Sequence, residues 1–108
     1  MPGASASIGL IAVIATLAVG LTAAGAASAT SARAAAAADS AALAAADAAS
    51  GRESGVPCDR AGELARAAGA ELASCALSGL IATVEVGVPF GVFTARAKAR
   101  AGPPPDGD

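Results

Sequence analysis

The sequence predicts a mostly helical protein in which a long apolar N-terminal helix carries a small α+β head. No charged side chain precedes Arg33, and residues 8–27 form one run that is almost entirely Ile, Leu, Val, Ala and Gly. Alanine-rich sequence without proline then continues to residue 50, and both cysteines lie beyond it. About 20 apolar residues in a helix are enough to cross the hydrocarbon core of a bilayer. The first segment therefore either anchors the chain in a membrane or directs its export.

We assign residues 1–7 to a short leader and residues 8–28 to a transmembrane helix. The leader lacks the Lys or Arg of an ordinary signal peptide, and Arg33 on the far side weakly opposes an N-in orientation. The two cysteines nevertheless favour an oxidising space for everything that follows the helix. We therefore expect a single-pass protein of the cell membrane whose C-terminal part is extracytoplasmic.

Residues 29–50 are predicted to extend the same helix outside the membrane, because alanine is the best helix former. One helix from about Ser7 to Ser50 would be roughly 65 Å long. Small residues such as Gly20, Gly25 and Ser28 would let another helix approach closely. An alanine-rich composition without any such contact is the alternative interpretation.

Gly, Ser and Pro interrupt the helical pattern in a linker at residues 51–57. Residues 58–93 follow as the small extracytoplasmic head. We expect Asp59 to cap a short helix over residues 60–68, with Gly69 directly after its end.

Two strands are predicted next, a weaker one over residues 71–76 and a stronger one over residues 80–90, with a turn between them. The stronger strand alternates apolar and other residues, which is typical of a half-buried strand. Pro89 indicates a sheet edge or a strand end. Two strands alone are marginal, so a helix or a partner must cover the valine face.

The cysteines, Cys58 and Cys75, are expected to form a disulfide. Two cysteines in a small exported domain usually pair, and closing a loop of about 18 residues would contribute about 3 kcal/mol. Two reduced, buried cysteines are the alternative.

Residues 94–108 are predicted to form a tail, first basic and then rich in Pro and Gly and disordered. Its cations, Arg96, Lys98 and Arg100, occur at every second position. A final strand would point all three the same way. We favour a solvated tail, which could touch anionic lipid headgroups.

Composition argues against catalysis, cofactors and nucleic-acid binding. The chain has 108 residues, a net charge of −2, no histidine, and no aromatic residue besides two phenylalanines. It lacks phosphate-binding and hydrolase motifs, and two thiols without histidine would leave a zinc shell half empty. Glu63 and Glu71 are the nearest approach to paired acids, and a solvated surface explains them. We therefore predict no catalytic, cofactor-binding or metal-binding residues, no enzyme activity and no nucleic-acid partner.

The order of segments resembles the TadE-like proteins encoded beside helicase and secretion genes in high-GC Gram-positive bacteria. The resemblance covers the small-residue start, the apolar and alanine-rich helix, the spacing of Cys58 and Cys75, the valine strand and the basic ending. It implies a minor pilin or pseudopilin of a Tad/Flp-type pilus or secretion system. Only Gly3 could serve as a leader cleavage site, and no acidic residue precedes Asp39. The implied partners are the membrane, other pilin-like subunits including copies of itself, and a secretion platform and ATPase.

Two other functions fit the sequence. Residues 27–29 read Ala-Ser-Ala, so a signal peptidase could cut after Ala29 and release a small secreted, disulfide-bonded binding protein. The alanine-rich helix continues past this position without a break, which disfavours cleavage. A self-associating membrane peptide of the holin or toxin type is a weaker alternative, because it would not need a cysteine-bearing head.

Overall fold

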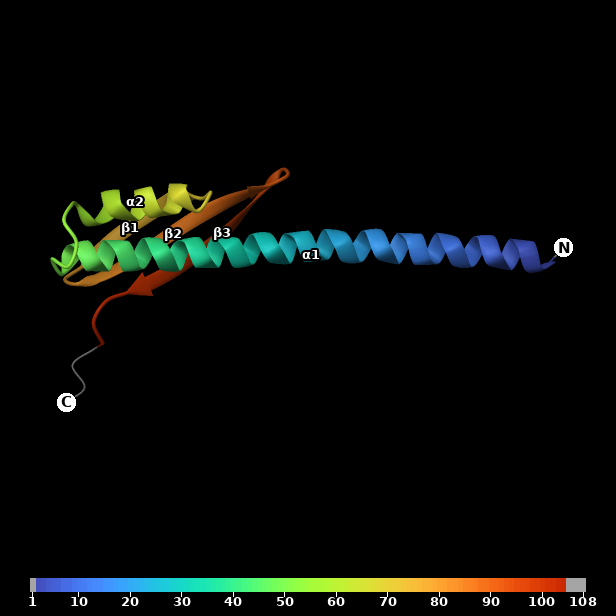
Figure 1. The fold of residues 1–108 in the computed structure, drawn as a ribbon, viewed down its shortest axis with the longest axis horizontal. Helices are drawn as coiled ribbons and strands as arrows, with labels where there is room; N and C mark the ends of the chain where they lie inside the picture. The colour runs from blue at the N-terminus through green and yellow to red at the C-terminus, as the bar shows by residue number, and fades with distance from the viewer. Residues whose placement is uncertain (1, 105–108) are drawn as a thin grey trace.

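The computed structural model describes residues 2–104, with side chains from Ser7 onward except at Ala23. Helix α1 (Pro2–Ala49) is followed by helix α2 (Pro57–Ala67) and by strands β1 (Glu71–Ser78), β2 (Ile81–Phe90) and β3 (Phe93–Ala101). The strands form one antiparallel sheet in the order β1-β2-β3. The C-terminal half of α1 lies with α2 against this sheet, and its N-terminal half projects alone (Figure 1). The described chain is therefore elongated, with extents of 76 × 33 × 18 Å.

Helix α1 is continuous, as predicted, and it begins at Pro2, so the leader assigned to residues 1–7 is helical where it is described. Proline is tolerated in a first helical turn because the N–H groups there have no partner within the helix. The helix ends at Ala49, and Gly51 terminates it with a φ of 81°, which is easily reached only by glycine. The Arg52 N–H donates to the carbonyl of Asp47 at 2.9 Å, which completes a Schellman motif.

Helix α2 begins earlier than predicted. Its N-cap is Val56, with Pro57 at the first helical position and no side-chain cap, so the assignment of Asp59 as N-cap is wrong. Proline fixes φ at a helical value and thereby starts the helix before Asp59, whose carboxylate instead favours the first turn through the helix dipole. Gly69 is the C′ residue, as predicted, and the Ala70 N–H donates to Ala65 at 2.9 Å.

The predicted hairpin is present as β1 and β2. Its two-residue turn consists of Gly79, with φ of 62°, and Leu80. Pro89 lies where the sequence indicated, near the end of β2 and beyond Gly87, the last β2 residue that pairs with β1. The missing Pro89 N–H therefore costs no hydrogen bond to β1.

The prediction of a solvated tail from residue 94 is wrong, because Phe93–Ala101 forms β3, paired along its whole length with β2. Strand β2 offers a second edge of unpaired N–H and C=O groups, and β3 satisfies them. The small side chains of Ala95, Ala97 and Ala99 also fit under α1. Of the Pro/Gly-rich end, residues 105–108 lie outside the described residues.

The core lies between α1, α2 and the sheet and is built from small side chains. Val84 and Val86 on β2 are its largest fully buried members, and α1 covers this valine face, while α2 packs on α1 and β1. The rest of the core is mainly alanine, including Ala34, Ala37, Ala38, Ala41, Ala42, Ala45 and Ala46 on one face of α1. The alanine-rich extension therefore packs within its own chain.

Candidate membrane anchor and the head it carries

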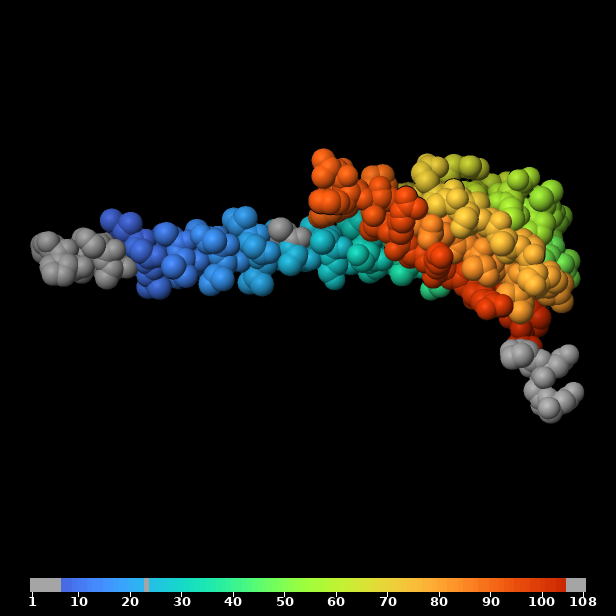
Figure 2. Space-filling view, turned by 180° about the vertical axis from the view of Figure 1, so that it is seen from behind, coloured from blue at the N-terminus to red at the C-terminus, as the bar shows by residue number. Residues whose placement is uncertain are grey.

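The N-terminal half of α1 is an uncovered apolar rod. Its large apolar side chains are 57% to 73% exposed, and none of its described residues is buried before Ala34. The rod is visible in Figure 2 as the blue part of the chain beyond the head. The uncovered residues are Ile8, Leu10, Ile11, Val13, Ile14, Leu17, Val19 and Leu21. So much contiguous exposed apolar surface indicates contact with a membrane or with other proteins.

The two threonines inside this rod satisfy their hydroxyl groups within the helix. The hydroxyls of Thr16 and Thr22 each donate to the carbonyl four residues earlier, at 2.9 Å. Thr30 does the same at 3.0 Å where the rod meets the head. A helix in lipid must satisfy its polar groups internally, and these threonines do so.

The length of the rod matches a bilayer. The uncovered part from Ser7 to Ala29 would be about 35 Å long at 1.5 Å per residue, against about 30 Å of hydrocarbon. The apolar window has a mean hydropathy of 2.2, so α1 is long and apolar enough to span a membrane. A signal sequence near an N-terminus has the same length and composition.

The rod offers room for close helix packing at several points around its surface. A Cβ added at Gly9, Gly20 or Gly25 would meet no atom within 4 Å. Ala18, Val19, Thr22 and Ala26 line a shallow groove on the same segment. Small residues of this kind let two helix backbones approach each other in a membrane.

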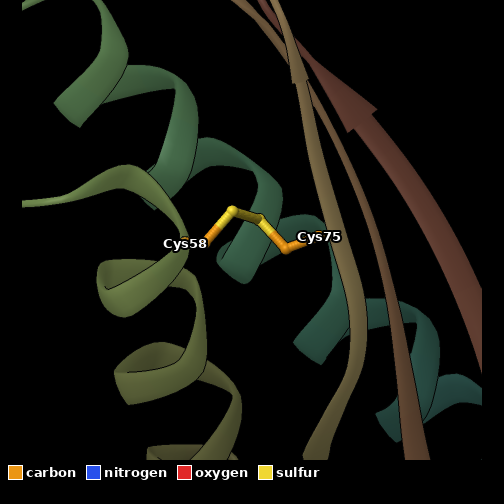
Figure 3. The surroundings of a disulfide bond; sticks show 2 residues. All are labelled: Cys58 and Cys75. Atoms are coloured by element: carbon orange, nitrogen blue, oxygen red, sulfur yellow. A yellow bond between two sulfur atoms is a disulfide. The ribbon is translucent and has the colours of Figure 1, made fainter.

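A disulfide joins the two layers of the head. Cys58 in the first turn of α2 is bonded to Cys75 in β1, with their Cα atoms 5.8 Å apart (Figure 3). Cys75 faces inward and packs against the core. The bond therefore holds α2 on the sheet, where buried alanines alone provide little contact area.

The outer face of the sheet carries the charges of β3. Strand alternation places Arg96, Lys98 and Arg100 together on this face, as the sequence indicated for a strand. Glu85 on β2 pairs with Lys98, and its carboxylate lies 3.8 Å from Lys98 and 3.5 Å from Arg96. Exposed pairs of this kind contribute at most about 1 kcal/mol, so this face is chiefly a solvated basic surface.

The two acidic residues considered from the sequence, Glu63 and Glu71, line the same shallow hollow between α2 and the start of β1, together with Asp59 and Arg66. The Glu63 carboxylate lies 2.7 Å from Arg60 on the exposed side of α2, and Glu71 begins β1. Within residues 2–104, no three or more Cys, Asp or Glu side chains are grouped so as to hold a metal ion. A shallow groove of about 460 Å³ near Leu43, Arg52 and Pro103 contains no histidine or cysteine.

The sequence interpretation missed the apolar turn between β2 and β3. Gly91, with φ of 60°, and Val92 form this turn, and Phe90 pairs with Phe93 across it. Val92 is 94% exposed and Phe93 74% exposed. The available signal was a glycine between two apolar residues immediately before the period-2 pattern of β3.

No protein family, curated protein or solved structure matches this chain.

Proposed function

We propose that this protein is a non-catalytic, TadE-like minor pilin or pseudopilin subunit of a Tad/Flp-type pilus or secretion system. Residues 8–28 of α1 anchor it in the cell membrane, and its disulfide-bonded head lies on the extracytoplasmic side. Its partners are other pilin-like subunits, copies of itself among them, and a secretion platform with its ATPase. The choice of these partners rests on the resemblance of the sequence to that family.

The observation that carries the proposal is the division of α1 into two halves with different surfaces. One face of α1 between Ala34 and Ala46 is buried against the head, whereas the large apolar side chains from Ile8 to Leu21 are 57% to 73% exposed. A soluble domain would leave that much apolar surface in water at a large cost. A subunit that moves from the bilayer to contacts between helices would keep it covered throughout.

Intact mass measurement on fractionated cells tests the membrane location. We expect a membrane-bound species that is full length or shortened only near Gly3. Reductant should add about two mass units, the two hydrogens of one disulfide. A soluble species that begins at Thr30 would exclude the anchored subunit.

Cross-linking in intact membranes tests the partners. Mass spectrometry of purified adducts should identify pilin-like subunits. A double variant, Gly20→Leu with Gly25→Leu, should lose these adducts because larger side chains separate the helix backbones. Leu21→Ile is the matched control and should retain them. Adducts that never contain a pilin-like subunit would refute the assembly role.

The alternative is a secreted binding protein released by signal peptidase after Ala29. One observation favours it: among the residues whose side chains the structure describes, Thr30 is the first partly covered one and Ala34 the first buried one. Cleavage after Ala29 would thus leave the packed part of α1 intact. Against it, α1 remains helical through residues 27–29. The same intact mass measurement separates the two functions.

A further inference from the structure

The β2–β3 tip, which we define as residues 88–95, extends beyond the rest of the sheet. Strand β1 begins at Glu71, opposite Gly87, whereas β2 and β3 remain paired as far as Phe90 and Phe93. From Gly87 to the turn at Gly91 this overhang is about 13 Å long at 3.3 Å per residue. The tip is therefore a two-stranded projection.

The composition of the tip is unusual for an exposed turn. No charged residue occurs between Glu85 and Arg96, and the tip contains both phenylalanines of the chain. Val92 is 94%, Phe93 74% and Phe90 37% exposed. Turns on a protein surface are normally polar, so this cluster indicates that something else covers it.

The tip lies at the end of the head that is nearest to the bare half of α1. In Figure 1 it points along α1 toward the N-terminus, and in Figure 2 the same orange tip stands beside the place where the uncovered rod begins. The other hairpin turn, Gly79-Leu80, lies at the opposite end of the sheet, because the strands are antiparallel. Of the two turns, the β2–β3 tip is thus the one that faces the plane in which a bilayer around the rod would end.

We propose that the β2–β3 tip inserts into the interfacial layer of the bilayer that α1 spans, as a second contact between head and membrane. The inference rests on the proposed membrane location and adds a lipid-binding surface to it. Aromatic and aliphatic side chains favour the boundary between headgroups and acyl chains. Arg96, the first charge after the tip, is exposed and suited to contact lipid phosphates. A single helix would let the head rotate about its axis, whereas this second contact holds it in one orientation.

Tryptophan fluorescence of the full-length, oxidised chain in phosphatidylcholine vesicles tests the tip. The natural chain contains no Trp or Tyr, so one introduced tryptophan reports its own position. The variants are Val92→Trp at the tip, Leu80→Trp as a matched control in the other two-residue turn, and Leu17→Trp in the middle of the rod. Vesicles with brominated acyl chains quench only those tryptophans that contact lipid.

We expect the emission of Leu17→Trp and Val92→Trp to shift to shorter wavelength and to be strongly quenched by brominated lipid. The emission of Leu80→Trp should show neither effect. Quenching at Leu17 without quenching at Val92 overturns the inference and leaves the membrane anchor intact. If the emission of Val92→Trp shifts to shorter wavelength but is not quenched by brominated lipid, the tip contacts protein and not lipid. That result overturns the inference. Absence of quenching at Leu17 refutes the membrane anchor itself, and the inference with it.

Discussion

At the scale of single residues, the buried alanines of α1 determine how closely the helix lies on the sheet. Ala38, Ala41 and Ala45 have no exposed surface, so their methyl groups occupy all the space between the helix and its neighbours. Close-packed interiors accommodate little additional volume. Alanine at these positions is thus required by packing as well as favoured by helix propensity.

The variant Ala41→Leu should therefore destabilise the protein by about 1–3 kcal/mol through overpacking. Urea denaturation of the full chain in detergent micelles, followed by circular dichroism, measures the change. Ala36→Leu is the matched control, because Ala36 is exposed on the same helix and leucine is also a good helix former. Equal midpoints for the two variants would mean that α1 does not pack on the sheet through this face.

The disulfide between Cys58 and Cys75 also contributes to the free energy of unfolding. The double variant Cys58→Ala with Cys75→Ala should lose about 3 kcal/mol, since the bond closes a loop with a separation of 17 residues. The natural chain under reducing conditions should unfold at nearly the same urea concentration as the variant. Reductant should not alter the variant, and a reductant effect on it would show that the loss has another cause.

Individual residues also show where sequence reasoning succeeds. Gly69 was identifiable because a glycine after an amphipathic run ends a helix through its own backbone freedom. Asp59 was misassigned as a cap because Pro57, two positions earlier, starts the helix without any side-chain hydrogen bond. Local sequence predicts a helix end well when it contains one signal, and less well when two, such as Pro57 and Asp59, occur within one turn.

At the scale of elements, β3 shows what a single sequence leaves undetermined. Alanine, lysine and arginine are poor strand formers, so residues 94–101 carry only a period of two as a signal. They form a strand because β2 presents an unpaired edge and α1 leaves space only for small side chains. Both causes are tertiary. The turn at Gly91 has a local signal in the sequence, but its position as an exposed apolar tip beyond β1 follows from the strand register.

Strand β3 should be essential for the head. Removing residues 93–108 would expose the edge of β2 and leave a two-stranded sheet, which is marginally stable. We expect this truncated chain to lose the amide exchange protection of β2. Removing residues 105–108 alone should leave that protection unchanged. Persistent protection after the longer truncation would show that β1 and the helices suffice to hold β2.

At the scale of the whole molecule, the two halves of α1 have different surfaces, and the charge pattern separates them. The first charge is at Arg33, beyond the uncovered rod, and the buried alanines begin at Ala34. The uncovered rod therefore ends within about one helical turn of Arg33, the first charged residue. The sequence predicts where the apolar segment ends, because hydropathy along the chain requires no knowledge of the fold. The packing of Ala34 to Ala46 against the head depends on the fold and cannot be read from hydropathy.

The same division can be tested by moving charge into the rod. Replacing both Leu10 and Leu17 by arginine places two charges seven residues apart in the apolar segment, each costing about 2.5–3.5 kcal/mol at the centre of a membrane helix. We expect most of the protein to become extractable from membranes by alkaline carbonate. The matched change, Leu43→Arg with Ser40→Arg, lies on the exposed side of the packed half and should leave the protein membrane-bound. If the rod variant stays in the membrane while its head remains folded, the membrane contact must come from the head. If both variants are extracted, added charge itself and not its position controls the distribution.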